Sequence, residues 1–112
     1  MQWQRPIIAT LNDTGETLLA RRNADPSTSY TASLFAKGPD AILKKIGEES
    51  AELIMAAKDG KRLSIVNEAT DVVYHILVLM AFFDLSADDI LQELHRREGI
   101  SGIDEKRSRA TS

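Results

Sequence analysis

Five acidic side chains, gathered in two short stretches, are the residues of this sequence best suited to chemistry. The first stretch holds Glu48, Glu49 and Glu52, and the second holds Glu68 and Asp71. Residues three or four apart lie on one face of an α-helix, so each stretch would present its carboxylates together. Like charges at this spacing repel each other, and they therefore call for a compensating cation.

Two such helices lying side by side could enclose a hard divalent cation with oxygen ligands. The chain has no cysteine, which excludes thiolate zinc sites, cysteine nucleophiles and disulfides. An all-carboxylate set favours Mg²⁺ or Mn²⁺ over zinc. Each stretch alone could be a solvated or lysine-paired helix face, but the two together favour a metal site. We interpret His75 as a hydrogen-bonded core residue and His95 as an exposed one.

Basic residues flank the acidic ones. Lys44 and Lys45 precede Glu48 by about one turn, and Lys37 lies just before them along the chain. Solvated lysines on a helix face are the alternative reading. However, a metal site that takes a polyphosphate also needs cations near the phosphates that the metal does not reach. We therefore expect Lys37, Lys44 and Lys45 to bind phosphate groups.

The elements that must position these residues are helices. Apolar residues recur at helical spacing between the glycine and proline breaks, and no segment alternates cleanly enough to predict a strand. The fold class is therefore predicted to be all-α. The first predicted helix reaches about Arg22, unless this segment is a frayed tail before Thr17. A short helix through Leu34 and Phe35 follows, and then two long helices, one from Pro39 to Asp59 and one over about 63–83. The last predicted helix starts at a capping box formed by Ser86 and Asp89 and ends at Gly99.

The two long helices are expected to be buried. The stripe predicted to face the core of the 39–59 helix consists of Ile42, Leu43, Ile46, Leu53, Ile54 and Ala57. The 63–83 helix is apolar almost all round, which is typical of the central helix of a bundle. Its apolar stretch is too short for a membrane span and is interrupted by ionisable groups.

Composition narrows the class of protein further. The 112 residues, 12.4 kDa in mass, suit one domain. A formal charge of -3 argues against a nucleic-acid binder, which usually has a strong basic excess. The first residues hold no apolar run that would predict a signal peptide or membrane anchor. We expect a cytoplasmic protein with no nucleic-acid or membrane partner.

The order and spacing of the carboxylates resemble a known superfamily, the all-α nucleoside triphosphate pyrophosphatases, or MazG-like proteins. Further stretches are similar to one family within it, the phosphoribosyl-ATP pyrophosphatases. These stretches are Ser-Tyr-Thr-Ala at 29–32, Leu-Phe-Ala-Lys-Gly at 34–38, Lys-Ile-Gly-Glu-Glu at 45–49 and Asn-Glu-Ala-Thr-Asp-Val-Val-Tyr-His at 67–75. The resemblance covers about residues 17–107, leaving residues 1–16 as an extension of unknown role and residues 108–112 as a flexible tail.

The resemblance implies both a fold and a reaction. The fold would be a MazG-like bundle of about four to five helices, oligomeric and commonly dimeric. The reaction would be hydrolysis of phosphoribosyl-ATP to phosphoribosyl-AMP and pyrophosphate, the second step of histidine biosynthesis. Mg²⁺, or Mn²⁺ in its place, would be the cofactor. The implied site residues are Glu49, Glu52, Glu68 and Asp71 as metal ligands, Glu48 with Glu49 as catalytic groups, and Lys37, Lys44, Lys45 and Asn67 as phosphate-binding groups.

Two other functions stay open on the sequence. A house-cleaning pyrophosphatase for damaged or surplus nucleotides would share the same carboxylate core. A helical oligomerisation module would carry the same acids and lysines as plain ion pairs. A panel of substrates distinguishes a house-cleaning pyrophosphatase from an enzyme that hydrolyses phosphoribosyl-ATP. Saturable stabilisation by a divalent cation distinguishes either enzyme from an oligomerisation module.

Overall fold

The computed structural model describes residues 18, 20–98 and 106–107. The described part of the chain is all-α and holds no strand. Its helices are α2 (Tyr30–Lys37), α3 (Pro39–Asp59), α4 (Arg62–Phe82) and α5 (Ala87–Arg96). The all-α prediction is thus confirmed. The predicted segment before Arg22 lies mostly outside the described residues, as do residues 1–16 and 108–112, although Leu18 is described and packs into the core.

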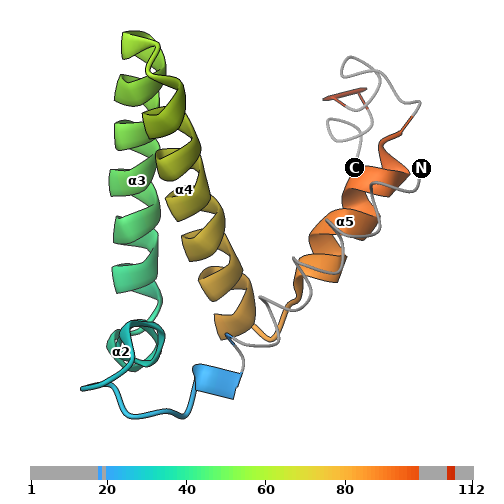
Figure 1. Cartoon of the computed structure of the whole chain (residues 1–112). Helices are drawn as coiled ribbons and strands as arrows, with labels where there is room; N and C mark the ends of the chain where they lie inside the picture. The colour runs from blue at the N-terminus through green and yellow to red at the C-terminus, as the bar shows by residue number, and fades with distance from the viewer. Residues whose placement is uncertain (1–17, 19, 99–105, 108–112) are drawn as a thin grey trace.

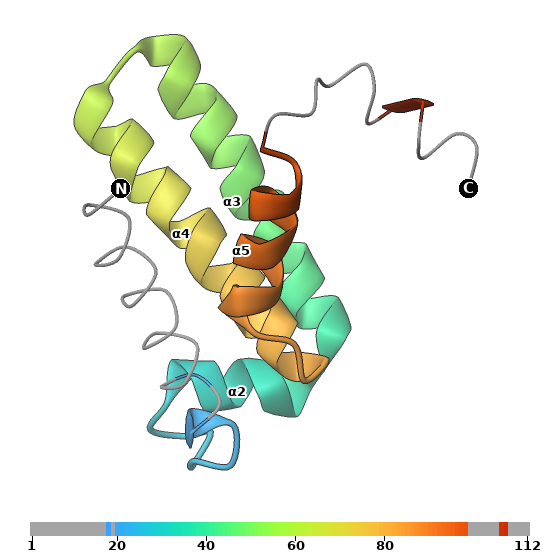
Figure 2. The same cartoon turned by 90° about the vertical axis from the view of Figure 1, so that its right-hand side faces the viewer.

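The two long helices form an antiparallel hairpin, and they lie side by side in Figures 1 and 2. α3 begins with Pro39, whose fixed φ and missing N–H suit the first turn of a helix. It ends at Gly60, which adopts a left-handed conformation (φ 69°) that glycine enters without strain. Because the turn contains only two residues, Gly60 and Lys61, α4 folds straight back along α3.

The shorter helices lie at the end of the hairpin where α3 begins and α4 ends. α2 crosses this end, and the ring of Phe35 stacks on that of Phe82 of α4, with centroids 6.3 Å apart. α5 leaves the same end and splays away from the hairpin (Figure 1). It starts at the predicted capping box, in which the Ser86 N–H donates to Asp89 Oδ2 at 2.8 Å. The helix ends at Arg96, earlier than the predicted Gly99, which is outside the described residues.

The core is smaller than the apolar pattern predicts. Within the described residues, it is formed by Leu18, Leu34, Phe35, Ile42, Leu77, Val78, Ala81 and Ala87. The prediction of a buried face was wrong for Leu43, for Ile54, whose exposed fraction is 63%, and for Ala57, which is also exposed. The long helices pack mainly against each other, so a stripe this wide is covered only in part.

The same holds for α4, which was expected to be buried along its length. Leu63 is 76% exposed, and Val66 and Val73 are exposed as well. The prediction that this helix is too short for a membrane span was wrong, because by length and composition alone α4 could cross a membrane, a property shared by core helices of soluble proteins. An apolar cleft of about 260 Å³ separates α4 from α5, and it is lined by Val73, Ile76, Leu77, Ala87, Ile90, Leu91 and Leu94.

Candidate metal centre

The antiparallel hairpin brings the two acidic stretches together. Glu48, Glu49 and Glu52 lie on α3, and Glu68 and Asp71 lie on the facing helix α4. Because the turn at residues 60–61 is so short, the second half of α3 lies beside the first half of α4. The expectation that the two halves meet on adjacent helices is therefore confirmed.

Three of the carboxylates converge. Glu49, Glu68 and Asp71 each offer an oxygen, and these oxygens all lie within 4.8 Å of one another. The side chain of Glu49 is only 12% exposed, whereas Asp71 is exposed. The group therefore joins both helices and opens to solvent on the Asp71 side.

The electrostatics of this group are unfavourable without a cation. One oxygen of Glu49 and one of Glu68, Oε2 in both, are buried with no hydrogen-bond partner among the described residues. The pKa of Glu68 is raised, first by a hydrogen bond with Glu52, then by burial and by the negative charges of Glu52, Glu49 and Asp71. Buried carboxylate oxygens without partners are costly, so such a cluster is stabilised by a proton, as the raised pKa of Glu68 indicates, or by a cation lying among the oxygens.

The donor set fits a hard divalent cation. All three converging groups are carboxylates, and oxygen-only ligand sets suit Mg²⁺, Mn²⁺ or Ca²⁺ rather than zinc. The two unpartnered buried oxygens would gain a partner from a cation lying among them. The residues present are thus chemically suited to the metal that the sequence predicts.

Lys45 is the lysine that the structure brings to this centre. Its Nζ lies 3.5 Å from Glu48 Oε2 and 3.9 Å from Glu49 Oε1. These distances are long for ion pairs, and Lys45 sits one turn before both acids on α3. Lys45 therefore supplies positive charge at the edge of the centre without filling it.

The other predicted site residues lie farther out. Glu52 is exposed and contacts the centre through Glu68. Glu48 is half-exposed and paired with Lys45. The remaining predicted residues are exposed on three different helices, and in the described part of the chain none of them pairs with the converging carboxylates: Lys37 at the end of α2, Lys44 on α3 and Asn67 on α4.

A polar cluster that the acidic pattern did not indicate adjoins the centre. The Tyr30 hydroxyl of α2 lies 2.9 Å from His75 Nε2 of α4. Next to it, the hydroxyls of Thr31 and Tyr74 form a second hydrogen bond between the same helices. The prediction of a hydrogen-bonded core position for His75 is confirmed, since the residue is 5% exposed and both of its ring nitrogens have hydrogen-bond partners. Nothing in the spacing of the sequence indicates that residues 30 and 75 meet.

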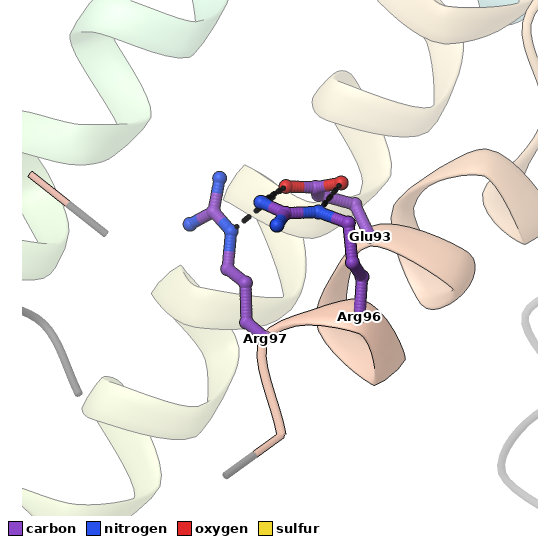
Figure 3. A network of polar contacts seen from close by, with 3 residues as sticks. All are labelled: Glu93, Arg96 and Arg97. Carbon is purple, nitrogen blue, oxygen red and sulfur yellow. Dashed lines mark hydrogen bonds and ion pairs between the residues drawn. The ribbon is translucent and has the colours of Figure 1, made fainter. Parts of the chain in front are cut away.

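A second charged cluster lies on α5 and has a different character. Figure 3 shows Arg96 and Arg97 converging on Glu93. Arg96 Nη2 lies 2.7 Å, and Arg97 Nε 3.0 Å, from Glu93 Oε1. The two guanidinium groups lower the pKa of Glu93 to about 2 through these hydrogen bonds. His95 is exposed, as expected, and pairs with Glu98. These ion pairs stabilise the end of α5, where cations also favour the helix dipole.

Comparisons with known proteins converge on one family. The family described as phosphoribosyl-ATP pyrophosphohydrolase matches residues 11–98, a range that starts inside the 1–16 extension. The phosphoribosyl-ATP pyrophosphatase of Dechloromonas aromatica is 70% identical over 101 residues, 90% of this chain and 94% of the relative. That of Aromatoleum aromaticum is 56% identical over 105 residues, 94% of this chain and 97% of the relative. That of an Azoarcus species is 57% identical over 102 residues, 91% of this chain and 95% of the relative.

Proposed function

Because the chain belongs to the phosphoribosyl-ATP pyrophosphohydrolase family, and so is a hydrolase, we propose that it hydrolyses phosphoribosyl-ATP in histidine biosynthesis. The products would be phosphoribosyl-AMP and pyrophosphate, and Mg²⁺ would be the cofactor, with Mn²⁺ as a substitute. The observation that carries the proposal is the group of three converging carboxylates, two of which bury an oxygen with no partner in the described structure.

Glu49, Glu68 and Asp71 would hold the cation, and Glu52, which lies beside Glu68, would support the site through that residue. When bound, the cation supplies positive charge that stabilises the charge developing on the leaving pyrophosphate. The role of the chain is to hold the cation-binding carboxylates in place. Glu49 and Glu68 come from two packed helices, so their carboxylates need little reorganisation before reaction.

Glu48 is the group we assign to the attacking water. Its carboxylate lies outside the converging group but shares the ammonium group of Lys45 with Glu49, and it is exposed enough to reach water. In hydrolysis, the water oxygen bonds to phosphorus and the anhydride bond between the α and β phosphates breaks. Glu48 would orient the water and accept its proton, with Glu49 beside it as the second catalytic carboxylate.

Lysines would complete the neutralisation of the polyphosphate. Lys45 already lies at the centre, where its ammonium is 3.5 Å from Glu48 Oε2. Lys37, Lys44 and Asn67 are exposed, so their side chains are available to a substrate that spans the neighbouring surface. A substrate with several phosphates presents more negative charge than one divalent cation balances.

We further propose that the working form is a homodimer or a higher homo-oligomer in the cytoplasm, with no nucleic-acid or membrane partner. Exposed apolar side chains on α3 and α4, together with the apolar cleft between α4 and α5, leave apolar surface open to solvent, and such surface is typical of interaction sites. A second copy of the chain would cover this surface.

A substrate panel tests the proposal. Phosphoribosyl-ATP, ordinary nucleoside triphosphates and oxidised triphosphates are compared at equal concentration with Mg²⁺, and pyrophosphate release is followed. We expect phosphoribosyl-ATP to be preferred by at least about a hundredfold in kcat/KM, because its extra phosphoribosyl group adds binding contacts. A preference for modified triphosphates would instead identify a house-cleaning enzyme.

A further inference from the structure

Asp71 is held less firmly by its own side chain than the other two converging carboxylates. Glu49 and Glu68 each bury an oxygen, whereas Asp71 is exposed. Within the described residues, the Asp71 carboxylate forms no hydrogen bond or ion pair with another side chain. Its place beside Glu49 and Glu68 therefore depends on the stretch of α4 backbone that carries it.

His75 contacts this stretch of backbone directly. It lies one turn after Asp71 on α4, and its Nδ1 is 2.8 Å from the backbone carbonyl oxygen of Asp71. Side chains of a helix lean toward its N-terminus, so the ring of His75 covers the turn that begins at Asp71. In a regular helix the same carbonyl also accepts the N–H of residue 75. Asp71 is therefore joined to His75 through both the backbone and the imidazole ring.

The two hydrogen bonds of the His75 ring have a defined direction. A carbonyl oxygen only accepts hydrogen bonds, so the proton of the neutral ring sits on Nδ1 and is donated to Asp71. Nε2 is then an acceptor, and the hydroxyl of Tyr30, 2.9 Å away, donates to it. These bonds form a chain from the first residue of α2, through the ring, to the turn that carries Asp71.

The imidazole ring is fixed in this position by its surroundings. His75 is 5% exposed, so a ring that turned away would leave buried polar atoms without partners. The rings of Tyr30 and Tyr74 also meet it edge to face, with centroids 5.9 and 5.2 Å from that of His75. Tyr30 itself follows the N-cap Ser29, whose hydroxyl accepts a hydrogen bond from the Ala32 N–H at 3.2 Å.

We propose that His75 is a positioning residue for the cation site: together with Tyr30, it fixes the turn of α4 from which Asp71 joins the converging carboxylates. The alternative is that His75 only docks α2 on α4. The two roles need different hydrogen bonds, because docking requires the bond with Tyr30 and positioning requires the bond with Asp71. The positioning role rests on the proposed function only in that a divalent cation binds the carboxylates.

Calorimetric titration of Mg²⁺ into the protein without substrate tests this role. His75→Phe keeps an aromatic ring but loses both hydrogen bonds, and we expect Mg²⁺ affinity to fall about tenfold, the lower end of the loss that removal of a supporting group causes. Tyr30→Phe should cost only about threefold, because the bond to Asp71 remains, and nothing further in the His75→Phe background. Unchanged Mg²⁺ affinity in His75→Phe, or no Mg²⁺ binding by the wild type, would overturn the proposal.

Two amide substitutions separate the hydrogen bonds of His75. The amide of His75→Asn takes the place of Nδ1 and still donates to Asp71, whereas that of His75→Gln takes the place of Nε2 and still accepts from Tyr30. We expect Mg²⁺ affinity to fall about threefold in His75→Asn and about tenfold in His75→Gln. The reverse order would make His75 a docking residue for α2 only.

Thr31→Val is the matched control, because it removes the neighbouring hydrogen bond between α2 and α4, which Thr31 forms with Tyr74. It should lower the melting temperature about as much as Tyr30→Phe and leave Mg²⁺ affinity unchanged. An equal loss of affinity in Thr31→Val would show that docking of α2 alone accounts for the effect. If His75→Phe does not fold, the comparison of Tyr30→Phe with Thr31→Val decides between the two roles.

Turnover of phosphoribosyl-ATP is measured separately on the same variants. If Mg²⁺ binding weakens as expected but the wild type does not turn over phosphoribosyl-ATP, the proposed function fails and the role of His75 stands. If the wild type turns over this substrate and His75→Phe binds Mg²⁺ as tightly as the wild type does, only the role of His75 fails.

Discussion

Glu49 of α3 and Glu68 of α4 bring carboxylate oxygens within 4.8 Å of each other, and each buries an oxygen with no hydrogen-bond partner in the described part of the chain. Two negative groups so placed raise the free energy of the folded state until a cation joins them. The relationship therefore predicts how stability depends on divalent cations, on pH and on each acidic residue.

The first prediction concerns Glu68. Its pKa is raised, so the folded chain binds this proton more tightly than the unfolded chain does. Stability should then fall as pH rises from the ordinary value of 4.5 through the raised pKa. At neutral pH without a divalent cation, Glu68→Gln should melt no lower than the wild type. Saturating Mg²⁺ should raise the melting temperature of the wild type but not that of the variant.

Thermal unfolding in EDTA and in Mg²⁺, followed by circular dichroism, measures both effects. Asp59→Asn, at the far end of α3, is the control and should respond to Mg²⁺ as the wild type does. An equal Mg²⁺ shift in Glu68→Gln would show that the cation binds elsewhere.

The second prediction separates the converging carboxylates from Glu52. Glu49→Gln and Asp71→Asn should each lower turnover of phosphoribosyl-ATP more than about a hundredfold while the fold survives, because each removes a cation ligand. Glu52→Gln should cost only about tenfold, since Glu52 is exposed and acts through Glu68. Steady-state kinetics with saturating Mg²⁺ and far-ultraviolet circular dichroism provide the comparison; an equal loss at Glu52 would make it a direct ligand.

Glu48 should behave differently from its neighbour. If it accepts the proton of the attacking water, Glu48→Gln lowers kcat by about a hundred- to ten-thousandfold and leaves Mg²⁺ affinity unchanged. Calorimetric titration of Mg²⁺ and the pH profile of kcat measure the two effects. Recovery of the variant at high Mg²⁺ would instead assign Glu48 to cation binding.

Sequence reasoning succeeded where local rules decide the outcome. Pro39 and Gly60 bound α3, and Ser86 with Asp89 starts α5, because caps and turns act within a few residues. The two acidic stretches were also expected on adjacent helices, and the two-residue turn of Gly60 and Lys61 brings those helices side by side.

Sequence reasoning failed where the outcome depends on what covers a surface. Leu43 and Ile54 belong to an apolar stripe, yet both are exposed, because no other helix in the described part of the chain covers them. Helical periodicity indicates which residues share a face of a helix. It does not indicate whether that face packs against the same chain or against another chain. The Tyr30–His75 hydrogen bond was not predicted for a similar reason, since contacts between residues far apart in the sequence leave no periodic pattern.

The apolar cleft between α4 and α5 gives a prediction about assembly. Leu94 lines this cleft and is exposed, so Leu94→Gln should weaken self-association at least about tenfold by removing buried apolar surface. His95→Gln, one residue further along the same helix and outside the cleft, should leave it unchanged. Sedimentation equilibrium measures both; an association constant that Leu94→Gln leaves intact would place the interface elsewhere.

The ion pairs of α5 predict a separate pH dependence. Hydrogen bonds from Arg96 and then Arg97 lower the pKa of Glu93 from its ordinary value of 4.5 to about 2. At any pH above 4.5 the ionised Glu93 carboxylate therefore stabilises the folded state. This contribution is lost as pH falls from 4.5 through about 2. Urea unfolding should therefore find Glu93→Gln less stable than the wild type at neutral pH, with the difference vanishing near pH 2. A difference that is constant with pH would rule out the ion pairs as its cause.

The central claim is that the converging carboxylates hold the cation that phosphoribosyl-ATP hydrolysis requires. Pyrophosphate release from phosphoribosyl-ATP, measured for the wild type and Glu49→Gln as Mg²⁺ is raised from zero, tests it most directly. We predict no turnover by the wild type in EDTA, saturable activation by Mg²⁺, and no activation of Glu49→Gln. Full turnover without a divalent cation, or activation of Glu49→Gln equal to that of the wild type, would contradict the account.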